Sequence, residues 1–319
     1  MPEKVFLTRR LPGPVMDRLG RHFQISFNSR DRQLKKSEII RGIQGCRGLI
    51  SMLSDPIDAE VISSEPGLEI IANYAVGTNN IDIEAAREKG IVVTNTPGVL
   101  TEATADLCWA LILSLGRRVL EGDGLVRSGK WTGWAPTQLV GADLTGKTLG
   151  IIGFGRIGQA VARRAHGFGL RTLYHSRTRL TAGKEKKLHV TYSSFNSLLS
   201  RSDIVSLHCP LTPATRFLIG RKAFSRMKKT ALLINTARGP IVEERELATA
   251  LRAGEIGGAG LDVYEREPLV ERGLKNLKNT VLLPHLGSAA LETRIQMGWM
   301  VLENLKAVFK KRKVPNPVG

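Results

Sequence analysis

A glycine-rich turn between a strand pattern and a helix pattern constrains the fold more than any other feature. The apolar run Thr148–Ile152 predicts a buried strand and leads directly into Gly153-Phe154-Gly155-Arg156-Ile157-Gly158. The residues that follow, 159–164, favour the start of a helix. A G-x-G-x-x-G motif alone is weak evidence, but between a strand and a helix it predicts a dinucleotide-binding unit. This part of the chain is therefore expected to form a parallel α/β sheet.

The three glycines of the motif have separate roles in such a unit. Gly153 permits the tight turn, Gly155 lets a pyrophosphate approach the backbone, and Gly158 lets helix and strand pack closely. The N-terminus of the following helix presents free N–H groups and the positive end of its dipole to the phosphates. The alternative is a glycine-rich turn that binds no ligand.

The end of the next predicted strand bears on the choice of cofactor. NAD-binding folds usually place an acid there, about 20 residues after the glycines, to hold the ribose 2′-hydroxyl. This chain instead has Ser176-Arg177-Thr178-Arg179. Arginine suits charge-assisted binding of a phosphate. We therefore predict that NADP(H) is preferred, although a basic loop that also accepts NAD(H) stays possible.

Strand and helix patterns alternate in two parts of the chain, which predicts two parallel α/β units. In the first part we expect strands at 5–7, 24–27, 48–52, 68–72 and 91–94, and helices at 14–20, 37–43, 58–64 and 83–89. In the second part we expect strands at 148–153, 171–175, 204–209, 231–236, 259–263 and 280–284, and helices at 156–167, 220–227, 244–253 and 289–312. Between them, 101–126 predicts one long helix, and 141–146 supplies turn residues. The last helix, after the second sheet, is expected to pack on the first unit.

The charge balance narrows the kinds of partner. Lys plus Arg is 47 against 29 for Asp plus Glu, which gives a net charge of +18. Such a balance favours anionic partners, among them nucleic acid, an anionic substrate or a phosphorylated cofactor. The one basic block, Lys310–Lys313, is typical of a solvated helix end, and we find no zinc-finger spacing and no aromatic-basic RNA motif. We therefore expect a small anionic substrate and no nucleic-acid partner.

The three cysteines, Cys46, Cys108 and Cys209, are widely spaced and form no C-x-x-C pair. This pattern argues against a disulfide framework and against a metal site, and favours a reducing compartment. The first residues lack a signal-peptide pattern, and the most apolar segment, 107–115, is too short to span a bilayer. We therefore expect a cytoplasmic protein with no membrane partner.

Three polar residues follow predicted strands of the second part: Arg238, Glu267 and His285. In open α/β sheets, ligands bind beyond the carboxyl ends of the strands. Histidine can give a proton at neutral pH, a neighbouring carboxylate orients it, and arginine can bind a carboxylate through two N–H groups. The trio thus suits reduction of a 2-keto acid, with His285 as acid, Glu267 as its partner and Arg238 as anchor. Taken singly, each residue could instead be a structural or surface group.

Four motifs, in order, resemble the D-isomer-specific 2-hydroxyacid dehydrogenase family, and the resemblance covers nearly the whole chain. They are residues 150–158, 235–239, 260–268 and 284–289, with 95–98 in support. Ser176-Arg177-Thr178 and Trp131–Trp134 are similar to the glyoxylate/hydroxypyruvate reductase branch. Formate dehydrogenases of this family carry Gln where this chain has Glu267, which argues against formate oxidation.

The resemblance implies an α/β fold of two doubly wound parallel-sheet domains with a cleft between them. A flavodoxin-like substrate domain would comprise 1–100 plus 288–319, and a Rossmann cofactor domain 101–287. A helix and arm at about 101–145 would build a homodimer, in which Trp134 would reach the partner's active site.

The resemblance also implies roles for individual residues. Arg238, Glu267 and His285 would be catalytic. The substrate would be held by the backbone N–H groups of Val76 and Gly77, together with Arg238, Ser288 and Trp134. Asp262 would orient the nicotinamide amide. The cofactor would contact Thr104, Gly153, Gly155, Arg156, Ile157, Gly158, Ser176, Arg177, Thr178, Cys209, Pro210, Thr236, Asp262, His285 and Gly287.

The function predicted from the sequence is an NADP-preferring reductase that converts glyoxylate or hydroxypyruvate to glycolate or D-glycerate. Two alternatives remain at this stage. One is a reductase of a larger keto acid such as 2-ketogluconate, because the fold does not fix the substrate. The other is a dinucleotide-sensing scaffold like the corepressor branch of the family, to which the high positive charge would lend nucleic-acid affinity.

Overall fold

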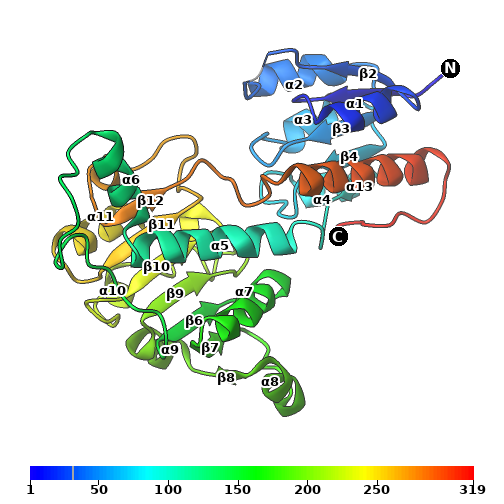
Figure 1. Ribbon diagram of the computed structural model, residues 1–319. Helices are drawn as coiled ribbons and strands as arrows, with labels where there is room; N and C mark the ends of the chain where they lie inside the picture. The colour runs from blue at the N-terminus through cyan, green and yellow to red at the C-terminus, as the bar shows by residue number, and fades with distance from the viewer. Residues whose placement is uncertain (31) are drawn as a thin grey trace. The chain divides into compact units, whose positions relative to one another are not determined.

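The chain folds into two units, each built on its own parallel sheet. A computed structural model describes residues 1–30 and 32–319 (Figure 1). Contacts divide them into a first unit, Met1–Leu100 with Ala289–Gly319, and a second unit, Thr101–Ser288. No helix in these residues is both long enough and apolar enough to cross a membrane. Within them, acidic, cysteine and histidine side chains form no group of three or more that could hold a metal ion.

The first unit is built on a five-stranded parallel sheet with the order β2-β1-β3-β4-β5. This is the flavodoxin-like order of doubly wound sheets. The strands are β1 (Lys4–Leu7), β2 (Gln24–Phe27), β3 (Gly48–Ser51), β4 (Ile70–Asn73) and β5 (Val92–Thr94). The helices are α1 (Gly13–Gly20), α2 (Lys36–Ile43), α3 (Ala59–Ser63), α4 (Ile83–Glu88) and α13 (Leu291–Phe309).

Helices cover both faces of the first sheet, and its central strands β3 and β4 are therefore buried along their whole length. On one face α2 contributes Ile39 to an apolar cluster. On the other face α13 packs with α1, and its Val301 and Leu305 join Val5 and Ile50 in a second cluster. Continuous burial of this kind is what parallel sheets require.

The second unit contains a seven-stranded parallel sheet with the order β12-β11-β10-β9-β6-β7-β8. Numbered from β6, its strands run 3-2-1-4-5-6-7, which extends the Rossmann order and places the switch point between β6 and β9. The strands are β6 (Thr148–Ile152), β7 (Arg171–His175), β8 (Val190–Tyr192), β9 (Ile204–Leu207), β10 (Leu232–Asn235), β11 (Gly258–Leu261) and β12 (Thr280–Leu282). The longer helices are α5 (Thr101–Gly116), α6 (Val119–Arg127), α7 (Arg156–Gly167) and α11 (Glu244–Arg252), and the shorter ones α8 (Ala182–Leu188), α9 (Phe195–Arg201), α10 (Arg221–Phe224) and α12 (Arg272–Lys275).

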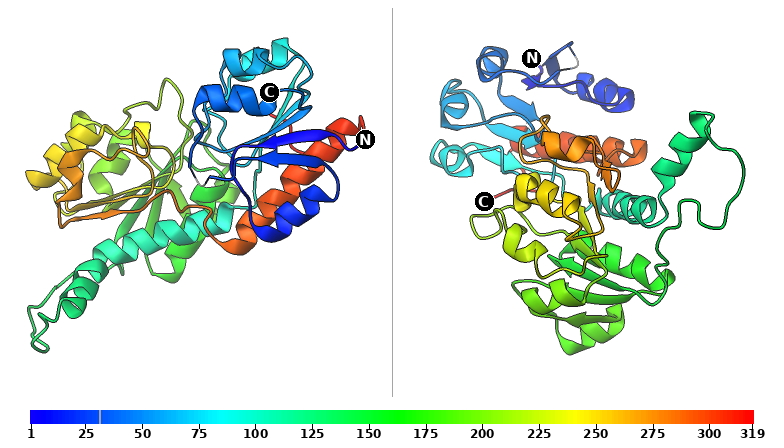
Figure 2. Two further views of the ribbon diagram at one scale, coloured as in Figure 1. Left: turned by 90° about the horizontal axis from the view of Figure 1, so that it is seen from above. Right: turned by 90° about the vertical axis from the view of Figure 1, so that its left-hand side faces the viewer.

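The prediction of one long helix over 101–126 was wrong. Helix α5 ends at Gly116, and Arg118 adopts a left-handed conformation with φ of 53° before α6 begins. The carbonyl of Gly116 accepts the N–H of Ala142 at 2.7 Å, so a returning loop uses the end of α5. Helix α6 buries none of its side chains. Together with the loop that follows it, α6 projects away from the rest of the second unit (Figure 2).

Sequence patterns missed the elements between 182 and 201 and the short helix α12. Helix α8 is rich in lysine and has no buried residue, so it lacks the apolar periodicity that marks a packed helix. Strand β8 has three residues and lies at the edge of the sheet. Short edge elements of this kind leave little hydrophobic signal.

Candidate active site

The predicted dinucleotide loop lies at the switch point of the second sheet and is built for close approach. Gly153 has φ of 89°, and a Cβ there would come within 2.3 Å of the backbone nitrogen of Cys209. A Cβ at Gly158 would come within 2.4 Å of the Gly153 carbonyl oxygen. At Gly155, by contrast, a Cβ would meet no atom within 4 Å. Packing thus explains the first and third glycines, and the open space at the second fits a pyrophosphate.

The surroundings of this loop offer further groups to a dinucleotide. No side chain caps helix α7, whose first N–H groups belong to Arg156 and Ile157. Thr236, after β10, is buried, and its hydroxyl has no hydrogen-bond partner in the described structure. An orphaned buried hydroxyl costs free energy, so this position fits a group that would bind to it. Burial raises the pKa of Cys209 to about 11, which leaves its thiol neutral beside Pro210.

The two arginines of the loop after β7 differ in their contacts. Arg179 forms an ion pair with Glu185 at 2.9 Å and lies over the ring of Tyr192. Arg177 is exposed, and no contact of its side chain is found within the described residues. The hydroxyl of Ser176 donates to the Thr178 carbonyl at 2.6 Å, which closes the turn. Of the two guanidiniums, Arg177 is therefore the one available to an anion.

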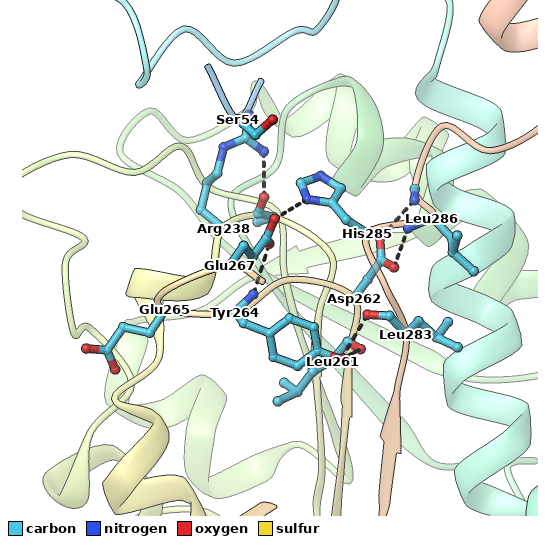
Figure 3. Close-up of polar contacts among 12 residues, drawn as sticks. Ser54, Arg238, Leu261, Asp262, Tyr264, Glu265, Glu267, Leu283, His285 and Leu286 are labelled. Carbon is cyan, nitrogen blue, oxygen red and sulfur yellow. Dashed lines mark hydrogen bonds and ion pairs between the residues drawn. The ribbon is translucent and has the colours of Figure 1, made fainter. Parts of the chain in front are cut away.

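The three predicted catalytic residues lie together in the second unit (Figure 3). Nδ1 of His285, after β12, lies 2.9 Å from Oε2 of Glu267. The other oxygen of Glu267 accepts the backbone N–H of Tyr264 at 3.1 Å. Burial opposes ionisation of Glu267, but the bond and charge of His285, the Tyr264 N–H and the charge of Arg238 together lower the pKa of this carboxyl below its usual value.

The backbone around His285 is held in an uncommon conformation. His285 has φ of 57°, a left-handed value that L residues seldom adopt. The next two N–H groups, those of Leu286 and Gly287, donate to the carboxylate of Asp262 at 2.6 and 2.8 Å. The carbonyl of Gly287 accepts from the Thr104 hydroxyl at 2.9 Å. Asp262 and Thr104 therefore fix the turn that presents the imidazole, a role distinct from their predicted contacts with a cofactor.

Arg238 follows β10 in a turn formed by Asn235. The Asn235 side chain accepts the Ala237 N–H at 3.1 Å and donates to the Arg238 carbonyl at 3.0 Å. The guanidinium of Arg238 donates to the Ala237 carbonyl at 2.6 Å. Burial lowers the pKa of Arg238, yet arginine remains charged at neutral pH because its ordinary pKa is so high. A half-buried cation of this kind suits a carboxylate ligand.

The predicted substrate groups of the first unit lie in the loop after β4. Val76 is exposed and Gly77 is half-buried, and no hydrogen bond from either backbone N–H is found within the described part of the chain. Trp134, on the loop after α6, is 82% exposed. Ser288, at the last position of the second unit, is half-buried.

Sequence reasoning missed two residues that shape the second unit's site. Asn235 could have been found, since asparagine at a strand end commonly closes a turn. Glu244, the first residue of α11, is buried and accepts the backbone N–H groups of Glu265 and, at 3.1 Å, Glu271. Those residues flank Glu267, so Glu244 holds the loop that carries it. A glutamate in the first helical turn gives no sign of such a contact.

Comparison with known proteins decides the family. Residues 109–287 match the family described as D-isomer specific 2-hydroxyacid dehydrogenase, NAD binding domain. A glyoxylate reductase of Korarchaeum cryptofilum is 49% identical over 317 residues, which cover 99% of this chain and 95% of that protein. The chain belongs to the D-isomer-specific 2-hydroxyacid dehydrogenase family. It is therefore an NAD(P)-dependent oxidoreductase, as its motifs predicted.

Solved structures of the family agree with this assignment. The TT0316 protein of Thermus thermophilus is 48% identical, with a TM-score of 0.93 and coverage of 99% of this chain and 100% of that one. An NADPH-dependent glyoxylate/hydroxypyruvate reductase of Sinorhizobium meliloti, solved with NADP and malonate, is 33% identical, with a TM-score of 0.90 and coverage of 100% and 97%. The predicted fold class of two parallel-sheet α/β domains is confirmed.

Proposed function

We propose that this dehydrogenase reduces glyoxylate or hydroxypyruvate to glycolate or D-glycerate, with NADPH preferred over NADH. The observation that carries the proposal is the hydrogen bond between His285 and Glu267, whose carboxylate also interacts with the half-buried cation of Arg238. The names of relatives support the substrate class, since proteins 49% and 47% identical to this chain are glyoxylate reductases.

In the proposed reaction, each group of the trio has one task. Bound NADPH supplies the hydride that adds to the keto carbon. His285 gives its proton to the carbonyl oxygen as the alcohol forms, and Glu267 holds the ring in position through Nδ1. Arg238 binds the carboxylate and polarises the carbonyl, with further contacts from Ser288 and from the N–H groups of Val76 and Gly77. His285 afterwards regains a proton from solvent.

The preference for NADPH is proposed from the loop after β7. No carboxylate lies within 176–180, and the nearby Glu185 is already bound by Arg179 and by the Tyr174 hydroxyl. Arg177 thus offers a positive charge where a 2′-phosphate would lie, with Ser176 and Thr178 in support. The phosphates would bind at Gly153–Gly158, and Thr236 and Cys209-Pro210 would line the remainder of the dinucleotide.

We also propose that α6 and the loop after it bind a second copy of the chain. Large apolar side chains are exposed on this arm, and a monomer gains nothing by exposing so many together. They are Val119, Leu120, Val126, Trp131, Trp134 and Val140. Sedimentation analysis should find a dimer for the full chain and a smaller species for Leu120→Lys; a wild-type monomer would contradict this proposal.

The function is tested by following reduced-nicotinamide absorbance with glyoxylate, hydroxypyruvate and 2-ketogluconate, each with NADPH and with NADH. We expect the highest kcat/KM with a small keto acid and NADPH. Turnover with NADH alone would keep the chemistry and refute the assignment of Arg177. Turnover only with 2-ketogluconate would refute the small substrate. No turnover with any pair would refute the reductase proposal and leave the dinucleotide-sensing scaffold.

A further inference from the structure

Buried polar residues end three neighbouring strands of the first unit. Ser51 ends β3, Asn73 ends β4 and Thr94 ends β5, and Ser51 is paired with Asn73 in the strand register. All three residues are fully buried. Burying a polar group costs free energy unless it is hydrogen-bonded, so polar residues at such buried positions need partners. Asn73 lies directly before the loop that contains Val76 and Gly77.

The amide of Asn73 is oriented from both sides. Its Oδ1 accepts the Ser51 hydroxyl at 3.3 Å, and its Nδ2 donates to the carbonyl of Gly77 at 2.8 Å. Asn95, directly after β5, donates from its Nδ2 to the carbonyl of Val76 at 2.8 Å. The backbone N–H of Thr96 donates to the carbonyl of Ala75 at 2.9 Å. Three consecutive carbonyls are therefore held by three N–H donors.

This arrangement fixes where the N–H groups of the loop point. In a trans peptide the N–H lies opposite the preceding carbonyl in one plane. The held carbonyls of residues 75, 76 and 77 share their peptides with the N–H groups of Val76, Gly77 and Thr78, which therefore face away from the donors. No hydrogen bond from these three N–H groups is found within residues 1–30 and 32–319. Adjacent N–H groups left open on one side form a cradle for an anion.

We propose that Asn73 and Asn95 are positioning residues for the substrate. By holding the carbonyls of Gly77 and Val76 they aim a cradle of three N–H groups, from Val76, Gly77 and Thr78, at the carboxylate of the keto acid. The inference rests on the proposed function for the identity of the anion, but the loop geometry does not depend on it. Neither asparagine need touch the substrate.

The test compares Asn73→Leu and Asn95→Ala with Thr94→Val in the full-length protein. Thr94 is the control, because it is a fully buried polar residue at the end of the neighbouring strand β5 and its hydroxyl has no partner in the described structure. We expect KM for glyoxylate to rise about tenfold in each asparagine variant, the change in an equilibrium constant that one hydrogen bond corresponds to. kcat should change less, and KM for NADPH and the properties of Thr94→Val should stay as in the wild type.

Hydrogen–deuterium exchange separates this inference from the proposed function. The amides of Tyr74 and Thr96, which donate to the Ser51 and Ala75 carbonyls at the two ends of the held loop, should exchange faster in both asparagine variants than in the wild type and Thr94→Val. Unchanged exchange in both would overturn the role of the two asparagines, and so would an unchanged KM for glyoxylate. If the wild type reduces no keto acid, the proposed function fails, while faster exchange would still support the held loop. Asn95 is only half-buried, so Asn95→Ala is informative even if Asn73→Leu does not fold.

Discussion

The two candidate binding edges of this dehydrogenase use different parts of the polypeptide. In the second unit the edge is formed by charged side chains, with His285 bound to Glu267 at 2.9 Å and Arg238 half-buried nearby. In the first unit it is formed by backbone N–H groups at Val76 and Gly77, with polar side chains behind them. Substitution of a side chain should therefore abolish function at the edge of the second unit. At the edge of the first unit it should leave function nearly intact, unless the supporting residues Asn73 and Asn95 are changed.

The largest effect is expected from His285→Ala, which removes the proposed proton donor. kcat should fall by about 10²–10⁴-fold, the usual contribution of a positioned acid, while NADPH binding survives. Steady-state kinetics measure kcat, and fluorescence titration measures the binding of NADPH. His189→Ala, at an exposed histidine that ends α8, is the control and should keep full turnover. Full turnover of His285→Ala would place the acid elsewhere.

Arg177→Ala should have the next largest effect, and Arg179→Ala is its matched control. Loss of Arg177 should raise KM for NADPH by about 10–100-fold, because it removes a charge-assisted hydrogen bond, and leave KM for NADH almost unchanged. Arg179 is already paired with Glu185, so its loss should alter the ratio of KM for NADPH to KM for NADH far less. Equal losses for the two cofactors would show that Arg177 does not bind the 2′-phosphate.

Acid should destabilise the second unit through the half-buried histidine His208. Nε2 of His208, after β9, lies 2.8 Å from the Ser206 hydroxyl, and burial lowers its pKa to about 3. In the unfolded chain this histidine takes up a proton near pH 6.5, whereas in the folded chain it stays neutral down to about pH 3. The free energy of unfolding is therefore full above pH 6.5 and falls as the pH drops toward 3. By about pH 5, His208 should lower the free energy of unfolding by roughly 2 kcal/mol.

Thermal unfolding of His208→Gln tests that linkage. The variant should lose less stability than the wild type between about pH 7 and pH 5, because glutamine has no proton to gain. The buried polar residues that end the strands of the first unit, Ser51, Asn73 and Thr94, have no titratable side chain in this pH range. Equal slopes for variant and wild type would contradict the assignment to His208.

The smallest effect is expected from Val76→Ala. This change keeps the backbone N–H and alters only an exposed side chain, so kcat/KM for glyoxylate should stay within about threefold of the wild type, as surface changes seldom exceed 0.5 kcal/mol. Initial-rate kinetics at several glyoxylate concentrations measure it. A loss approaching that of Asn73→Leu would show that the valine side chain, and not the N–H group, contributes to binding.

The same contrast explains what could be predicted from sequence. The dinucleotide turn, the strand ends and the trio of Arg238, Glu267 and His285 were accessible, because special backbone positions and charged side chains leave a signature in residue types. Val76 and Gly77 came only from the family resemblance, since a backbone N–H has no such signature. The break at Arg118 and the role of Glu244 were missed because each depends on a hydrogen bond between segments distant in the chain.

The most direct test of the central claim is the reduction of hydroxypyruvate with NADPH that carries deuterium at the transferred position of the nicotinamide. Chiral chromatography with mass spectrometry then reports the configuration of the product and the place of the label. We expect D-glycerate with one deuterium at C2, the former keto carbon. L-Glycerate, or a product without deuterium, would contradict the proposed reduction.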